Sequence, residues 1–282
     1  MCLLYISRKP IYNSIKATQG GTPMTQEERR IYLIQALLRE QPRYAGLEIP
    51  GSQEARKRLL RALLNVRPAM PASETFLAVQ DAYLQEAIRQ KGITALEDLT
   101  EGEEDLYLWR GDITTLRCDA IVNAANSGLL GCFCPNHGCI DNAIHTYAGV
   151  QLRLACWKIM EAQGHEEAPG QAKITPAFNL PSTYVLHTVG PIVGQRLTDK
   201  DCALLESCYR SCLTLAEARG AKSLALCCIS TGEFHFPNQK AAEIAVQTVK
   251  AYKRETNSGI KVIFNVFRET DEAIYRAFLR GN

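Results

Sequence analysis

The sequence predicts an α/β fold, in which a sheet covered by helices on both faces is preceded by a small all-helical region. Two observations lead to this prediction. The first hundred residues carry apolar side chains at helical spacing, and from about residue 105 short β-type runs alternate with helical stretches. Such alternation is typical of a sheet with helices packed against it. We therefore divide the chain into a loose extension (1–24), a helical region (25–100) and a sheet domain (101–282).

Three helices are expected in the helical region. Thr25 and Glu28 form a capping-box pattern at the start of the first helix. The second helix follows the break at Pro50-Gly51, and the third runs from near Ser73 to Gly92. We interpret their apolar stripes as core and see no chemistry here. The basic side chains of the second helix, which we expect on a solvated face, are Arg56, Lys57, Arg58 and Arg61.

The sheet domain is expected to contain six strands and four further helices. The predicted strands are 106–109, 120–123, 172–175, 184–188, 223–229 and 261–266. The predicted helices are 140–161, 199–218, 238–254 and 270–280. In sheets of this kind ligands bind in the loops that follow the carboxyl ends of strands, so the chemistry is expected after Trp109, Asn123 and Ile229.

Composition indicates a globular protein without a nucleic-acid or membrane partner. Of the residues, 46% are hydrophobic and 22% are charged, and the formal net charge is only +2. No apolar run approaches the roughly 20 residues that span a bilayer. The first charges come after a very short apolar segment, which is the wrong order for a secretory signal. Either Met1 or Met24 can serve as the start.

The cysteines favour a reducing compartment, and hence a cytoplasmic location. There are eleven of them, an odd number, in a long chain for which we predict no export signal. Five lie in apolar or helical patterns where burial as small hydrophobes is expected, namely Cys202, Cys208, Cys212, Cys227 and Cys228.

A different group of cysteines has the spacing of metal ligands. Cys132, Cys134, His137 and Cys139 lie directly before a predicted helix. Soft sulfur and imidazole ligands suit zinc better than magnesium or calcium. Three protein ligands would leave a position for water or substrate, as in catalytic sites, whereas binding by Cys134 as well would close the site and make it structural.

Four segments together resemble the macrodomain family, whose members bind ADP-ribose. The resemblance extends over roughly residues 105–280, and the occurrence of all four segments in this order is specific, although each alone is weak. It implies a macrodomain with a central mixed sheet flanked by helices. The segments are Gly111–Thr114, Ile121–Asn126, Ile140–His145 with Ala148-Gly149, and Ser230–Phe234.

One departure from the family pattern points to a subgroup. Most macrodomains carry a run of glycines before the helix that contains the aspartate, and here Cys132, His137 and Cys139 stand in its place. Together with the helical region, this resembles the zinc-dependent macrodomains of bacteria, which remove mono-ADP-ribose from proteins. The resemblance implies a zinc cofactor held by these three residues. It also implies ADP-ribose and a mono-ADP-ribosylated protein as partners, with a lipoyl-carrier protein as a candidate substrate.

The motifs can be read as a binding site for the nucleotide. The carboxylate of Asp112 can accept a hydrogen bond from the adenine amine, and the N–H of Ile113 can donate to a ring nitrogen; capping of a turn is the structural alternative for Asp112. The loop of Ser230, Thr231, Gly232, Glu233 and Phe234 can offer backbone amides to the diphosphate. We expect the Glu233 side chain to point outwards, and Phe234 to stack on the distal ribose or to join the core.

The remaining candidates surround the distal ribose. Asn126 can bond its hydroxyls, whereas Asn123 is expected to bond the backbone of its own loop. Asp141 can stabilise positive charge on the sugar or take a proton from the attacking water, unless it caps the helix. We name Asp141 and Asn126 as catalytic candidates, and place Ile140, Asp141 and Asn142 among the ligand-binding positions. His145 and His187 are interpreted as packed residues.

The sequence thus favours a zinc-dependent protein-ADP-ribose hydrolase. The alternative is a non-catalytic ADP-ribose-binding module with a structural zinc. A thiol redox protein is disfavoured because no Cys-x-x-Cys pair accompanies the strand pattern.

Overall fold

A mixed sheet of six strands forms the centre of the protein, as predicted. The computed structural model describes residues 18–19, 22–44, 46–100, 102 and 105–280. The strand order is β4-β10-β9-β6-β8-β7, with all neighbours parallel except β7 and β8. The strands are β4 (Leu106–Arg110), β6 (Ala120–Ala125), β7 (Ala172–Pro176), β8 (Tyr184–Val189), β9 (Ser223–Leu226) and β10 (Lys261–Val266).

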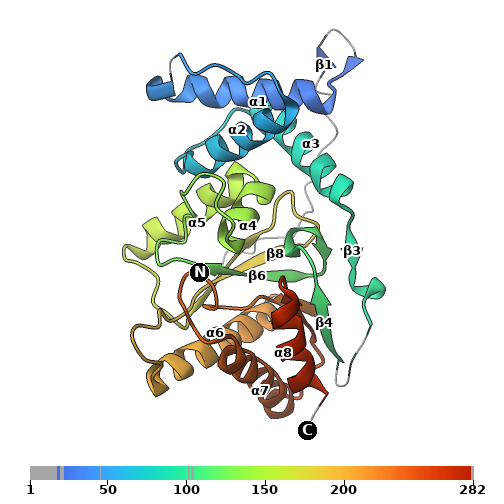
Figure 1. The fold of residues 1–282 in the computed structure, drawn as a ribbon, viewed down its shortest axis with the longest axis vertical. Coiled ribbons are helices and arrows are strands. Elements are labelled where there is room, and N and C mark those ends of the chain that lie inside the picture. Colours follow the sequence, from blue (N-terminus) through green and yellow to red (C-terminus); the bar gives the residue numbers. More distant parts are fainter. Residues whose placement is uncertain (1–17, 20–21, 45, 101, 103–104, 281–282) are drawn as a thin grey trace, which may run out of the picture.

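Helices cover both faces of this sheet (Figure 1). On one face lie α4 (Ile140–Ala148) and α5 (Val150–Gln163). On the other lie α6 (Asp199–Ala218), α7 (Asn238–Thr256) and α8 (Glu269–Leu279). The layers bury one continuous hydrophobic core.

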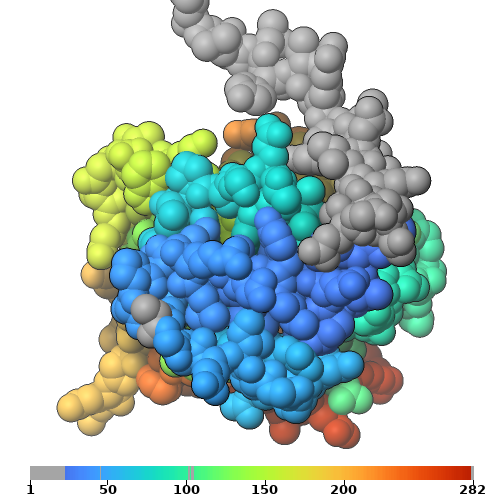
Figure 2. Space-filling view, turned by 90° about the horizontal axis from the view of Figure 1, so that it is seen from above, coloured from blue at the N-terminus to red at the C-terminus, as the bar shows by residue number. Residues whose placement is uncertain are grey.

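The three expected N-terminal helices are present and pack above α4 and α5, away from the sheet (Figure 1). They are α1 (Gln26–Glu40), α2 (Gln53–Val66) and α3 (Glu74–Lys91). They enclose a second core of their own, which also takes in Val150 from α5. Seen from above, these blue to cyan helices lie over the sheet domain (Figure 2).

The predicted helix starts follow from their capping residues. The Thr25 hydroxyl accepts a bond of 3.2 Å from the N–H of Glu28, whose carboxylate accepts one of 2.7 Å from the N–H of Thr25, so the capping box is confirmed. The hydroxyl of Ser73 accepts the N–H of Phe76 at 3.2 Å and so caps α3, and Gly92 ends this helix at φ +89°. Each such cap typically stabilises a helix by about 1 kcal/mol.

Some elements differ from the prediction. The single helix expected over 140–161 is two, because Gly149 at φ +96° ends α4 and turns the chain into α5. The strand expected over 223–229 stops at Leu226. In the region expected to be helical, β3 (Thr94–Ala95) pairs with β5 (Leu116–Arg117). The extension 1–24 lies mostly outside the described residues, and its end forms the short hairpin of β1 (Thr18–Gln19) and β2 (Thr22–Pro23).

The core contains the cysteines and histidines that we expected to be packed. Cys208, Cys212 and Cys227 are buried, and Cys202 and Cys228 are partly buried at its margin. His145 and His187 are also buried. Among the described helices, none is both long enough and apolar enough to cross a bilayer.

Candidate active site and metal-binding loop

The candidate residues meet at one edge of the sheet. Strands β4, β10, β9, β6 and β8 run parallel, so their carboxyl ends all lie at this edge. Asp112 follows β4, the loop of Ser230 follows β9, and Asn126 follows β6. The site therefore lies where the sequence places it.

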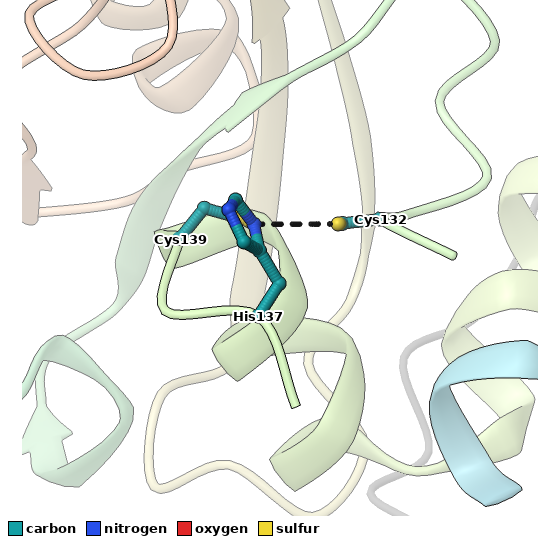
Figure 3. A group of neighbouring side chains, drawn as sticks. All are labelled: Cys132, His137 and Cys139. Carbon is teal, nitrogen blue, oxygen red and sulfur yellow. Dashed lines mark hydrogen bonds between the residues drawn. The ribbon is translucent and has the colours of Figure 1, made fainter. Parts of the chain in front are cut away.

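Three side chains of types that can bind a metal come together in the loop that precedes α4 (residues 131–139), which we call the metal-binding loop for this candidate role. Cys132, His137 and Cys139 bring one ligand atom each to within 4.8 Å of one another, and all three are half-buried. Sγ of Cys132 lies 3.5 Å from Nδ1 of His137, and the dashed line in Figure 3 marks this contact. Cys134 is exposed and is not part of this group. Two sulfurs and an imidazole at this separation form a donor set that fits a zinc ion.

Cys139 joins this loop to the helix. Its Sγ accepts the N–H of Asn142 at 3.4 Å, so Cys139, and not Asp141, is the capping residue of α4. Burial raises the pKa of the Cys139 thiol to about 12, the Asn142 N–H lowers it and the neighbouring Cys132 raises it. A thiol in such surroundings becomes a thiolate when a cation binds to it.

Asp141 is buried beside the metal-binding loop. Its Oδ1 accepts a bond of 2.7 Å from Nδ2 of Asn123. Burial raises the pKa of Asp141 to about 6, against the Asn123 bond and the charge of Arg153, which lower it. Nε2 of His145 is 3.6 Å from the carboxylate, but burial holds the pKa of His145 well below its usual value. The imidazole is therefore neutral, and the two do not form an ion pair.

Asn123, which lies within β6, and Asn126, which directly follows it, both contact Asp141. We expected Asn123 to bond the loop backbone, which is wrong: its amide instead joins Asp141 and lies 3.2 Å from Nδ1 of His187. Nδ2 of Asn126 is 3.5 Å from Oδ2 of Asp141 and donates to the Gly131 carbonyl at 3.2 Å. The structure thus brings both catalytic candidates together.

At the other end of the site, Asp112 already has partners. Lys91, the last residue of α3, lies 2.7 Å from its Oδ2, and the N–H and hydroxyl of Thr114 donate to Oδ1. Asp112 therefore does cap a turn, yet it remains 36% exposed, with lone pairs left for a ligand. Within the described chain no hydrogen bond uses the N–H of Ile113.

The loop of residues 230–234 after β9, which we call the anion-binding loop for its candidate role, has the donors that an anion needs. Of the residues described, none accepts a hydrogen bond from the N–H groups of Gly232, Glu233 or Phe234. The hydroxyl of Ser230 is buried without a partner in the described structure, and Ser230 adopts φ +64°. The Thr231 hydroxyl donates to the Cys228 carbonyl and holds the loop on its strand.

Two candidate side chains contact the metal-binding loop. Glu233 is 73% exposed, as expected for a side chain that points outwards, and its Oε1 lies 3.5 Å from Nε2 of His137. Asn142 is fully buried and its side chain bonds Arg61 and the carbonyls of Cys132 and Cys134. Its side-chain amide therefore holds the loop in place.

A pocket of about 350 Å³ opens beside these groups. It is lined by Asn126, Ser127, Pro169, Val189, Gly190, Ile192 and Phe234. Asn126 and Phe234 thus line the same pocket, which lies between the loop that follows β6 and the anion-binding loop. A larger cavity of about 500 Å³ lies between α7 and α8, and none of the candidate residues lines it.

Sequence reasoning missed four residues at the site. Arg61 and Lys91 come from the N-terminal helices, and their contacts with Asn142 and Asp112 have no sequence signal. Gly190 lies against Ser230, since a Cβ at Gly190 would be 2.0 Å from the Ser230 hydroxyl; a glycine before a proline at a strand end was the available signal. Phe267 follows β10 and is 78% exposed beside the β4 loop.

Known proteins share both the sequence and the fold. The family described as "Macro domain" matches residues 122–245. A "Protein-ADP-ribose hydrolase" of Treponema medium is 62% identical over 260 residues, covering 91% of this chain and all of the relative. One of Staphylococcus aureus (strain MRSA252) is 50% identical over 257 residues, covering 90% of this chain and 96% of the relative.

Solved structures show the same family. A macrodomain of Oceanobacillus iheyensis with ADP has a TM-score of 0.57 and 39% identity, covering 62% of this chain and 90% of that one. A Trypanosoma brucei macrodomain in complex with ADP-ribose has a TM-score of 0.59 and 30% identity, covering 77% of this chain and 94% of that one. With relatives so similar over nearly its whole length, the chain belongs to the macrodomain family.

Proposed function

We propose that this protein is a zinc-dependent hydrolase that removes mono-ADP-ribose from modified protein side chains. The relatives that match nearly the whole chain are named protein-ADP-ribose hydrolases, which supports the reaction. The observation that carries the zinc dependence is the grouping of Cys132, His137 and Cys139 beside Asp141. The exposed Cys134 lies outside this group, which favours an open position over a closed structural site.

The fixed groups of the site match the parts of ADP-ribose. Asp112 offers a carboxylate to the adenine amine, and the N–H of Ile113 can donate to a ring nitrogen. The exposed ring of Phe267, next to this loop, gives the base an aromatic face on which to stack. The unpaired amides of Gly232, Glu233 and Phe234, with the Ser230 hydroxyl, suit the diphosphate.

The distal ribose then fits the pocket between Asn126 and Phe234, in front of Asp141. Hydrolysis breaks the bond between the anomeric carbon and the acceptor atom, while a water oxygen bonds to that carbon and its proton passes to the acceptor. Asp141 stabilises the positive charge that develops on the sugar or accepts the water proton. A zinc ion held by Cys132, His137 and Cys139 would supply Lewis acidity towards a ribose oxygen.

The protein substrate and the compartment follow only from the resemblance and the composition. We propose a lipoyl-carrier protein as the modified substrate, as the zinc-dependent subgroup suggests. We also propose a reducing compartment such as the cytoplasm, because buried Cys208, Cys212 and Cys227 pack as small hydrophobes in the core.

The test separates turnover from binding. Release of ADP-ribose from a mono-ADP-ribosylated protein is compared between the wild type, Cys139→Ser and Cys134→Ser, with ADP-ribose affinity measured by calorimetry in parallel. We expect Cys139→Ser to lose turnover and Cys134→Ser to keep it, with binding retained in both. A wild type that binds ADP-ribose, contains zinc and releases nothing would instead be a non-catalytic binding module.

A further inference from the structure

Helix α2 of the N-terminal region reaches the metal-binding loop with two polar side chains. Its leucines at positions 60, 63 and 64 are buried in the core of the N-terminal helices and so fix how the helix is turned. Arg61 and Asn65, four residues apart, share the face of α2 that meets α4 and the loop. The apolar packing of the N-terminal helices thus decides where the side chains of Arg61 and Asn65 contact the sheet domain.

Arg61 connects the loop to α4 through a single guanidinium. Its Nη2 donates to Oδ1 of Asn142 at 2.8 Å and to the carbonyl of His137 at 2.9 Å, and its Nε donates to the same Oδ1 at 3.2 Å. The Asn142 amide in turn donates to the carbonyls of Cys134 at 3.0 Å and Cys132 at 3.5 Å. Two of the three proposed zinc ligands are therefore held through their own backbones.

Asn65 makes a second, separate connection and is only 1% exposed. Its Oδ1 accepts the N–H of Asn136 at 2.9 Å, and its Nδ2 donates to the Thr146 hydroxyl at 2.9 Å. Asn136 has φ +57° and directly precedes His137. The bond from Asn65 therefore fixes the turn from which the His137 imidazole projects.

From these contacts we propose that Arg61 and Asn65 are positioning residues for the metal site, through which the N-terminal helical region sets the affinity for zinc. The inference rests on the zinc centre of the proposed function. A loop that is already held in its ligand-bearing shape loses less conformational entropy when the ion binds. Partners that orient metal ligands typically contribute 10–100-fold in metal affinity.

The experiment measures zinc affinity of the full-length, metal-free protein by competition with a chromophoric chelator. The variants are Arg61→Gln, Arg61→Lys and Asn65→Ala, and the matched control is Arg58→Gln, since Arg58 is exposed on the same helix. We expect affinity about tenfold weaker in Arg61→Gln and Asn65→Ala. The zinc affinity of Arg61→Lys should be intermediate, because an ammonium keeps the positive charge but lacks the planar guanidinium that can donate two hydrogen bonds in parallel. Arg58→Gln should match the wild type.

Thermal unfolding of the metal-free proteins separates positioning from a merely structural role. We expect Arg61→Gln to unfold close to the temperature of Arg58→Gln while its zinc affinity falls. Wild-type affinity in both Arg61→Gln and Asn65→Ala would overturn the inference, as would affinity that falls only in step with the unfolding temperature across all variants. A wild type that binds no zinc would instead overturn the proposed zinc centre, and this inference with it.

Discussion

Nδ2 of Asn123 lies 2.7 Å from Oδ1 of Asp141, and this hydrogen bond ties the end of β6 to the first turn of α4 where almost no solvent reaches. Asn126, on the same loop, approaches the other carboxylate oxygen. Residues of β6 and its following loop thus hold Asp141, while the helix that contains Asp141 begins at Cys139, one of the candidate metal ligands. The sheet edge and the metal-binding loop form one site through this residue.

Asp141→Asn keeps the shape of this side chain and removes its charge. We expect ADP-ribose release to slow by about 10²–10⁴-fold, the range typical of a group that acts on a developing charge or a proton. ADP-ribose affinity, measured by calorimetry, should change far less, because Asp141 is only 5% exposed and its carboxylate already contacts Asn123 and Asn126. Turnover equal to that of the wild type would remove Asp141 from the mechanism.

Gly190→Ala tests the anion-binding loop. The added Cβ would lie 2.0 Å from the Ser230 hydroxyl, so the loop has to shift. Overpacking of this kind typically costs about 1–3 kcal/mol. Because the loop relieves the overpacking by moving its amides away from their positions, we expect ADP-ribose affinity to fall about tenfold, which corresponds to about 1.4 kcal/mol of binding free energy. Gly194→Ala is the matched control, because no atom lies within 4 Å of a Cβ built at Gly194. Equal affinities in the two variants would show that the loop does not bind the ligand.

Phe267→Ala tests the stacking of adenine. Stacking of a base on an aromatic ring contributes about 1–3 kcal/mol, so the affinity for ADP-ribose should fall about tenfold. The affinity for ribose 5-phosphate, which lacks the base, should stay unchanged. Trp157→Ala, which removes an exposed aromatic ring from α5, serves as the control. Loss of affinity for both ligands would contradict a role confined to the base.

His187 makes the stability depend on pH. Burial lowers its pKa to about 3 in the folded protein, whereas the unfolded chain takes up the proton near the ordinary value of 6.5. Between these values the unfolded state binds more protons, so the free energy of unfolding falls as pH falls, by at most about 1.4 kcal/mol per pH unit for this group. Above pH 6.5 the contribution is complete.

Urea unfolding of the metal-free protein from pH 7.5 to 5 measures this slope. His187→Gln should flatten it, although His145, whose pKa burial also lowers, will leave part of the slope in place. The control His165→Gln changes an exposed histidine. An identical slope in wild type and His187→Gln would show that His187 does not couple folding to protons.

Local signals in the sequence account for most of the fold. The bounds of α6 and β10 match the predictions, Thr25 caps its helix as expected, and the third helix starts at Ser73 as expected. Periodicity and capping act within a few residues, so they can be seen in a single sequence. Gly149 is present in the sequence as part of a family motif, and for that reason a single helix is predicted where α4 ends and α5 begins. Strand order and the antiparallel β7 depend on contacts between distant segments, which a single sequence does not reveal.

Local signals in the sequence also predict part of the candidate site, but not the residues that reach it from α2. Cys132, His137 and Cys139 share one loop, so sequence proximity brings them together. Asp112, Asn126 and Ser230 follow three parallel strands, whose carboxyl ends meet at one edge of the sheet. Arg61 lies 81 residues from Asn142 along the chain, and its basic neighbours made a solvated face the natural expectation. Its role depends on how α2 is rotated by its leucines, and the same is true of Asn65.

The central claim is that turnover requires a zinc ion held by the loop before α4. The direct test titrates zinc into metal-free enzyme while ADP-ribose release from a modified protein is followed. The account predicts no turnover without metal and a linear rise that ends at one zinc per chain, with none in His137→Ala at the same concentrations. Full turnover by the metal-free protein would contradict it.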